Sequence, residues 1–203
     1  MTTPEKRHPD PERARNRRRQ VLDAAAACFS RSGFHGASMA EISKAAGMSA
    51  GHIYNYFDGK DAIIAAFVEE NVERVSALLR DLEARGDVLQ ALLDDVPKSV
   101  AEHIDRDVWR LPLEITAEAS RNPTVAAVVY DADRRTRAIF RPLLKAGRER
   151  HGLPVDDALL EGRMDAIITV FQGLSARAQH NPDIDQAALT ASVQVAMKAL
   201  LFS

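Results

Sequence analysis

The chain contains only one cysteine, Cys28, so an intramolecular disulfide is excluded. Cys28 lies on the apolar face of the first expected helix, so we predict that it is a small buried apolar residue. No apolar run approaches the roughly 20 residues that a membrane-spanning helix needs. The first residues are polar and basic, without the apolar segment of a signal peptide. We therefore expect a cytoplasmic protein with no membrane partner.

Two further absences narrow the class of protein. Valines follow helical rather than alternating spacing, so almost no β-strand is predicted. The chain has no glycine-rich phosphate loop, no His-Glu-x-x-His, no Cys-x-x-Cys and no Gly-x-Ser-x-Gly motif. Its six histidines are scattered along the sequence. We expect an all-α protein that is not an enzyme, with no metal site and no cofactor.

Charge is distributed unevenly along a chain whose formal net charge is only -2. Of its 27 basic and 29 acidic residues, ten and six lie in residues 1–60, which leaves 17 and 23 for the rest. Several arginines cluster before the apolar face of the first helix: Arg13, Arg15, Arg17, Arg18 and Arg19. A basic N-terminal unit before an acidic body suits a nucleic-acid-binding head on a solvated second domain. The alternative is that the excess of basic residues in this part of the chain arose by chance and only forms a solvated surface.

The most informative stretch runs from Ser38 to Lys60. Ser38 and Glu41 are spaced as a capping box at the start of a short helix. Gly47 suits the left-handed position that ends a helix, and Ser49 suits the N-cap of a second one. Two short helices joined by a glycine-containing turn are the plan of a helix-turn-helix, whose second helix enters the DNA major groove.

Apolar spacing defines the inner faces of these two short helices. Ile42 and Ala45, with Ala46 beside them, are predicted for the first helix, and Ile53 and Phe57 for the second. The outer face of the second helix is polar, and its residue types hydrogen-bond base edges or phosphates. It consists of Gly51, His52, Tyr54, Asn55 and Tyr56, with Lys60 just beyond. The alternative is an ordinary helical hairpin with an exposed polar face.

Longer motifs make the assignment more specific. The first helix ends in the motif Phe-x-x-x-Gly-Phe. It is followed by Ser, by Ala-Gly-Met-Ser and, from Ile53 to Lys60, by Ile-Tyr-x-Tyr-Phe-x-x-Lys. This stretch resembles the DNA-binding domain of the TetR/AcrR family of bacterial regulators. The resemblance is close over about the first third of the chain and rests on helix number and length elsewhere. It implies nine helices: an N-terminal three-helix DNA-binding domain and a C-terminal helical domain for ligand binding and dimerisation.

The resemblance also implies roles for individual residues. The predicted DNA-binding residues are Ser38, Ser49, Gly51, His52, Tyr54, Asn55, Tyr56 and Lys60. Among them, Ser38, Tyr54, Tyr56 and Lys60 are expected on phosphates, and Gly51, His52 and Asn55 on bases. Ala40 and Ala50 stand where relatives often carry basic or hydroxyl side chains. Part of the sequence specificity is therefore expected to come from DNA shape.

We predict two domains. Residues 1–60 form the DNA-binding domain, with a flexible tail at 1–12, and residues 61–203 form the ligand-binding and dimerisation domain. The helices expected after the first domain span residues 60–84, 87–104, 107–121, 123–150, 156–180 and 183–201. Pro97 should kink or split the segment in which it lies. Asp183 and Gln186 are spaced as a capping box for the last helix.

A ligand pocket, if present, is expected between helices within residues 61–175. Its candidate residues are Phe67, His103, Trp109, Leu113, Glu114, Phe140, Met164, Ile168 and Phe171. An aromatic ring and a carboxylate in one cavity, here Trp109 and Glu114, would suit a cationic or amine-bearing apolar compound. The alternative is that Trp109 belongs to the core and that Glu114 pairs with Arg110.

Small residues on the last two helices, 156–180 and 183–201, allow close approach of a second subunit, so these helices are predicted to form a homodimer. A two-fold dimer reads two half-sites about 34 Å or a multiple apart, whereas one short recognition helix reads few bases. The sequence thus predicts a repressor that a small hydrophobic molecule releases from a palindromic operator in double-stranded DNA. The alternatives are an architectural DNA-binding protein without a ligand, and an interaction protein whose helix-turn-helix no longer binds DNA.

Overall fold

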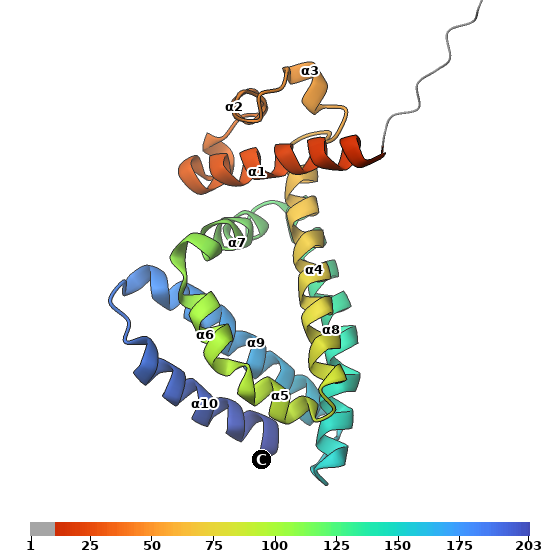
Figure 1. Ribbon diagram of the computed structural model, residues 1–203, viewed down its shortest axis with the longest axis vertical. Coiled ribbons are helices and arrows are strands. Elements are labelled where there is room, and N and C mark those ends of the chain that lie inside the picture. Colours follow the sequence, from red (N-terminus) through yellow and green to blue (C-terminus); the bar gives the residue numbers. More distant parts are fainter. Residues whose placement is uncertain (1–10) are drawn as a thin grey trace, which may run out of the picture. The chain divides into compact units, whose positions relative to one another are not determined.

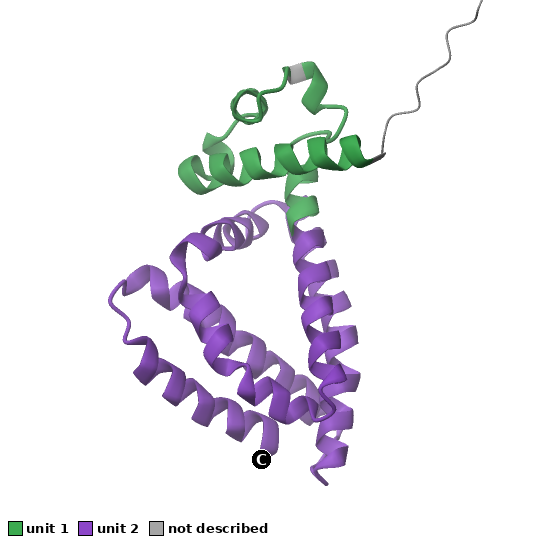
Figure 2. Ribbon diagram, viewed as in Figure 1, with its two compact units in different colours: residues 1–67 green, residues 68–203 purple. Residues whose placement is uncertain are grey.

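A computed structural model describes residues 11–203, in two compact units divided between Phe67 and Val68 (Figure 2). Within this part of the chain all regular elements are α-helices, ten in number (Figure 1). The all-α prediction is therefore confirmed. The predicted tail at residues 1–12 lies outside the described residues, except for Pro11 and Glu12, which begin the first helix.

The first unit contains α1 (Pro11–Gly36), α2 (Met39–Ala45), α3 (Ala50–Ile53) and the first turns of α4 (Lys60–Ala84). Its core is built from the apolar faces of these helices: Val21, Leu22, Ala25, Cys28, Phe29, Ile42, Ile53, Phe57, Ile63 and Ile64 are all buried. Cys28 is a buried free thiol, as its position on the apolar face predicted.

Gly33 interrupts α1 close to its end. Its backbone has φ 70 and ψ 170, a conformation that only glycine adopts without strain, and a short turn then continues to Gly36. The main part of α1 therefore ends where the sequence predicted, and the chain is redirected toward α2.

The second unit contains the rest of α4 and six further helices. These are α5 (Val88–Asp94), α6 (Val96–Ile104), α7 (Arg106–Ala119), α8 (Pro123–Arg150), α9 (Asp157–His180) and α10 (Gln186–Phe202). The described residues thus hold one helix more than the nine predicted, because the segment 87–104 splits into α5 and α6. Pro97 lies in the first turn of α6, where its missing N–H removes no helical hydrogen bond.

The start of α10 corrects one sequence prediction. The capping box expected from Asp183 and Gln186 does not form. Asp185 is the N-cap instead, and its Oδ1 accepts the Ala188 N–H at 3.0 Å. The Asp183 N–H is bonded to Asn181 Oδ1 at 3.2 Å, so Asp183 belongs to the preceding turn.

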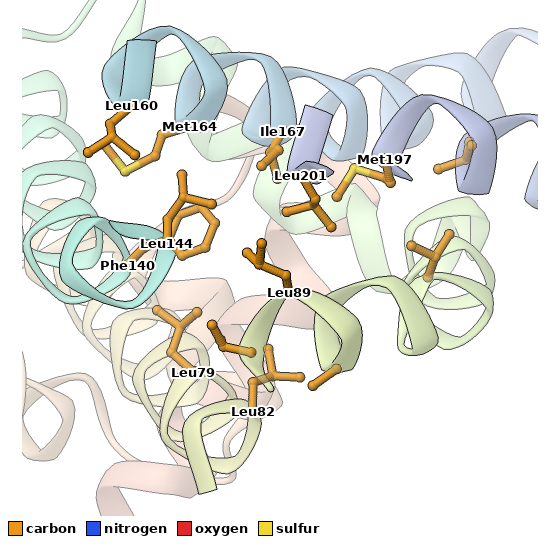
Figure 3. Close-up of a cluster of buried hydrophobic side chains, with 14 of the residues drawn as sticks. Leu79, Leu82, Leu89, Phe140, Leu144, Leu160, Met164, Ile167, Met197 and Leu201 are labelled. Atoms are coloured by element: carbon orange, nitrogen blue, oxygen red, sulfur yellow. The ribbon is translucent and has the colours of Figure 1, made fainter. Parts of the chain in front are cut away.

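Apolar side chains from six helices, α4, α5, α6, α8, α9 and α10, form the core of the second unit (Figure 3). The labelled residues are Leu79 and Leu82 of α4, Leu89 of α5, Phe140 and Leu144 of α8, Leu160, Met164 and Ile167 of α9, and Met197 and Leu201 of α10. Burial of such side chains is the main favourable contribution to folding.

One charged side chain is completely buried in this unit. Arg148 is 0% exposed, and its three nitrogens donate to the carbonyls of Pro154, Leu201 and Ser203 at 2.9, 2.8 and 2.9 Å. Burial lowers the pKa of the Arg148 guanidinium, and the nearby positive charge of Arg163 lowers it further. Arg148 thereby ties the end of α10 to α8 and to the loop before α9.

Ion pairs line the contact between α8 and α9. Arg137 pairs with Glu161 and Asp165, and Arg141 pairs with Asp157 and Glu161. The carboxylates are largely exposed, so each pair contributes little to stability on its own. Together the pairs orient the two helices as antiparallel neighbours.

Candidate functional site

The predicted capping box at the start of α2 is present. The Ser38 N–H donates to Glu41 Oε2 at 2.8 Å, and the Glu41 N–H donates to Ser38 Oγ at 3.1 Å. Hydrogen bonds from the Ser38 N–H and the Ser38 hydroxyl to the Glu41 carboxylate hold the pKa of that carboxyl below its usual value. Gly47 has φ 62, so the left-handed turn predicted after α2 is also confirmed.

The inner face of α2 differs from the prediction by one residue. Ala45 is exposed, whereas Ile42, Ser43 and Ala46 are buried. The Ser43 hydroxyl donates to the Ala40 carbonyl at 2.9 Å, which satisfies its hydrogen-bonding capacity inside the unit. A buried serine was missed because the sequence was searched for apolar spacing alone.

The second helix of the motif is short. Ser49 is its N-cap and accepts the His52 N–H at 3.3 Å, and regular helix ends at Ile53. Tighter turns continue the chain, with the Asn55 N–H bonded to the His52 carbonyl and the Tyr56 N–H to that of Ile53. The predicted inner residues Ile53 and Phe57 (0% and 4% exposed) anchor both ends of this segment.

Three of the predicted DNA-binding side chains contact one another. The two ring nitrogens of His52 lie 3.4 Å from Asn55 Nδ2 and 3.4 Å from the Tyr56 hydroxyl. The His52 and Tyr56 rings meet edge to face, with centroids 5.3 Å apart. The Tyr54 side chain stands apart and is 51% exposed. The segment therefore presents a connected polar surface.

Other predicted DNA-binding residues are also accessible, but several have roles within the unit. Ser38 and Ser49 are exposed, and both use their hydroxyls as helix caps. A Cβ added at Gly51 would meet no atom within 4 Å, so packing within the protein does not require glycine there. Lys60 Nζ donates to the carbonyls of Phe34 and Ala37 at 2.6 and 2.9 Å.

Two contacts that hold this surface on α1 were not predicted. Gln20 Nε2 donates to the Ala46 carbonyl at 2.6 Å, at the turn that precedes α3. The Arg18 guanidinium lies 5.0 Å from the centroid of the Phe57 ring. Both residues lie in the basic stretch of α1, and no local spacing connects them to partners more than 25 positions away.

In the second unit, three predicted ligand-binding residues come together from different helices. The His103 ring of α6 stacks on Trp109 of α7, with centroids 4.4 Å apart, and lies 5.1 Å from Phe171 of α9. His103 Nδ1 bonds to the Ser99 carbonyl at 2.7 Å, and Trp109 Nε1 donates to the Glu102 carbonyl at 2.9 Å. Burial lowers the pKa of His103.

Phe171 also packs against the hydrophobic core of this unit, which includes two further predicted ligand-binding residues. Phe140 and Met164 belong to the packed core, at 8% and 0% exposed, while Leu113, Glu114 and Ile168 are half-buried. Phe67 lies in the first unit, where it meets Phe29 edge to face with ring centroids 6.5 Å apart. Nothing in the sequence indicated this contact, because the two residues are far apart along the chain.

The last two helices leave a row of small side chains uncovered. On α10 these are Ala188, Ala191, Ser192, Val195 and Ala199, and on α9 they are Gly162, Gly173 and Ala176. Val195 is 73% exposed and is the most exposed of the large apolar side chains among the described residues. The larger apolar residues of α9, Leu160, Met164, Ile167 and Leu174, are buried within their own unit.

The described residues give no indication of other site types. Within residues 11–203 no three His, Cys, Asp or Glu side chains are grouped so as to hold a metal ion. No helix of this part of the chain is both long and apolar enough to cross a membrane.

Comparison with known proteins assigns both units. Residues 21–67 match the family described as "Bacterial regulatory proteins, tetR family", and residues 85–201 match "BetI-type transcriptional repressor, C-terminal". The repressor Rv1474c of Mycobacterium tuberculosis is 30% identical over 82% of this chain and 84% of its own length. The regulator UidR of Escherichia coli is 34% identical, but the match spans 55% of this chain and 56% of that protein.

Solved structures show the same architecture. Salmonella enterica GusR has a TM-score of 0.75 at 26% identity and covers 92% of this chain and 95% of its own. Bacillus subtilis FadR, solved with stearoyl-CoA, has a TM-score of 0.73 at 19% identity, with coverages of 90% and 97%. A Saccharomonospora viridis regulator solved with choline has a TM-score of 0.70 at 17% identity, with coverages of 91% and 96%.

The two family matches follow one another along the chain and coincide with an N-terminal helix-turn-helix and a C-terminal helical region, as the motifs between Gly33 and Lys60 predicted. The members of this family are regulators rather than enzymes. The chain belongs to the tetR family of bacterial transcriptional regulators.

Proposed function

We propose that this chain acts in the cytoplasm as a homodimeric transcriptional repressor that binds a palindromic operator and is released by a small hydrophobic molecule. The observation that carries the proposal is the connected polar surface of His52, Asn55 and Tyr56, held on a capped helix at the exposed side of a helix-turn-helix. Its residue types match the hydrogen-bonding groups of base edges and phosphates.

We assign the contacts within this surface by position. His52, Asn55 and Gly51 face the bases, since they lie on the outer side of α3 and the turn after it. Tyr54, Tyr56, Ser38 and Ser49 contact phosphates and fix the register on the duplex. With few base-reading side chains, each subunit reads a short half-site.

Dimerisation is supported by the uncovered small side chains of α9 and α10. A second copy packed on this face would bury Val195 and the alanines beside it, and it would place two recognition helices on two half-sites about 34 Å or a multiple apart. Val195→Glu places a charge in this contact. We expect a dimer for the wild type and a folded monomer for the variant in light scattering; a monomeric wild type would contradict the proposal.

For the effector, the structures solved with stearoyl-CoA and with choline support a small-molecule site in the helical domain. The His103, Trp109 and Phe171 cluster supplies an aromatic wall for such a site. A ligand can release DNA only if it binds the DNA-free state more tightly than the DNA-bound state.

The test is a gel-shift with the DNA upstream of the protein's own coding region. Wild type should bind saturably and with sequence dependence, and His52→Ala/Asn55→Ala should abolish the preference for that DNA over unrelated DNA. Arg134→Ala, an exposed change in the second unit, is the control and should bind as wild type. Binding that varies with salt alone would instead favour the architectural role.

The effector is tested by a thermal-shift screen followed by the gel-shift. Choline, stearoyl-CoA and apolar relatives of each are first screened for compounds that raise the melting temperature, because a ligand of the native state stabilises it. A compound that does so should also lower DNA affinity. If every stabilising compound leaves the gel-shift unchanged, release by a ligand is wrong.

A further inference from the structure

The junction between α1 and α2 contains two backbone carbonyls that lack a partner within a helix. If α1 continued, the Phe34 carbonyl would accept from the Ser38 N–H four residues later, but that N–H donates to Glu41 in the capping box. Ala37 precedes Ser38, the N-cap of α2, so its carbonyl lies outside both helices. The two carbonyls therefore need another donor.

Lys60, at the start of α4, supplies that donor to both. Its Nζ lies 2.6 Å from the Phe34 carbonyl oxygen and 2.9 Å from that of Ala37. It also lies 4.4 Å from the centroid of the Phe34 ring, a cation–π contact to a side chain that is only 5% exposed. An ammonium has three N–H donors, and two of them are thus used inside the unit.

We propose that Lys60 is a positioning residue for DNA recognition, whose ammonium holds the α1–α2 junction against the start of α4 instead of binding a phosphate. This inference rests on the proposed function and replaces the sequence-based expectation of a phosphate contact at Lys60. Lys60 fixes the start of α2, the Gln20 bond fixes the turn after α2, and α3 follows directly from that turn.

Salt dependence separates the two roles. Each phosphate contact that a lysine makes adds about one unit to the slope of log affinity against log salt concentration. Lys60→Met keeps most of the aliphatic stem and removes the ammonium. We expect a melting temperature about 5 °C lower in the absence of DNA, because two charge-assisted hydrogen bonds are lost. Below that temperature, operator affinity should fall about tenfold, while the salt slope stays that of the wild type.

Lys44→Met is the matched control. Lys44 is an exposed lysine on α2 whose side chain makes no hydrogen bond or ion pair among the described residues, so loss of its ammonium should leave the melting temperature unchanged. An unchanged melting temperature for Lys60→Met, or a salt slope reduced by about one unit, would overturn the inference. Lys60→Arg retains charged donors and should recover most of the melting temperature that Lys60→Met loses.

A double-mutant cycle provides a second arm for the case in which Lys60→Met folds poorly. Glu41→Ala frees the Ser38 N–H to bond to the Phe34 carbonyl, so Lys60→Met should lower the melting temperature less in that background. Additive losses would contradict the link between the capping box and Lys60. This arm uses no DNA, so a wild type that binds no operator would refute the proposed function and leave this result standing.

Discussion

Both units satisfy backbone carbonyls near a helix end with one cationic side chain from elsewhere in the chain, but in different surroundings. Lys60 in the first unit is half-buried, whereas Arg148 in the second unit is 0% exposed. Water can take over part of the role of an ammonium at an accessible junction, but it cannot replace the guanidinium at the buried Leu201 carbonyl. We therefore expect the junction beside the predicted DNA-binding surface to adjust more readily than the end of α10.

The largest expected effect is at Arg148. Arg148→Met leaves the buried carbonyl of Leu201 without its donor. We expect a loss of about 3 kcal/mol or more in the free energy of unfolding, measured by urea denaturation. Arg134→Met, at an exposed ion pair, should change it by less than about 0.5 kcal/mol. Equal losses for the two variants would remove the contrast between buried and exposed arginines.

Gly147 tests how rigid the second unit is. A Cβ at this position of α8 would lie 2.6 Å from Val88 Cγ1 and 2.9 Å from Leu89 Cγ of α5, so Gly147→Ala should cost about 1–3 kcal/mol despite the better helix propensity of alanine. A Cβ at Gly162 of α9 meets nothing within 4 Å. Gly162→Ala should therefore stabilise by up to about 1 kcal/mol. Because Gly162 lies on the proposed dimer face, both variants are compared at one protein concentration.

Substitutions at Gln20 test how strongly the first unit depends on its hydrogen bond to the turn between α2 and α3. Gln20→Ala removes the donor to the Ala46 carbonyl and should cost about 1 kcal/mol, since water replaces part of the bond. The loss should appear as faster hydrogen exchange of the Gly47 and Met48 amides, with the second unit unaffected. Gln20→Glu keeps the size but cannot donate, so it should be no better than alanine. Unchanged exchange in both variants would show that the turn does not depend on Gln20.

The smallest effect concerns pH and His103. Burial lowers the pKa of His103 in the folded state, so the unfolded chain binds its proton first as the pH falls. The stability that His103 contributes should therefore be present above about pH 6.5, the ordinary histidine value, and decline below it. In His103→Phe, which keeps a ring in the stack, this part of the pH dependence should be absent. Unfolding can be followed by the fluorescence of Trp109, the one tryptophan of the chain.

The DNA-binding region was the more predictable of the two sites because its determinants are local. Helix caps, the left-handed Gly47 and the spacing of Ile53 and Phe57 all lie within a few residues of the structure that they determine. Bonds such as those of Gln20 and Lys60 join distant positions, and no periodicity in the sequence marks them.

The ligand-binding set was less predictable because it depends on how four helices pack. Apolar type and helical spacing do not distinguish a core residue such as Met164 from a half-buried residue such as Phe171. They also did not reveal that Phe67 packs within the first unit. Only the assembled helices show that His103 and Trp109 stack.

The ion pairs between α8 and α9 have one further consequence. Arg137 and Arg141 are one helical turn apart, and their partners Asp157, Glu161 and Asp165 repeat at the same interval. A slip of one helix past the other by one turn, about 5.4 Å, would leave one arginine opposite two carboxylates and the other opposite only one, because the series ends at Asp157 and Asp165. Three ion pairs would then replace four, so these charges favour both the antiparallel direction of the helices and one sliding position, together with the apolar contacts beneath them.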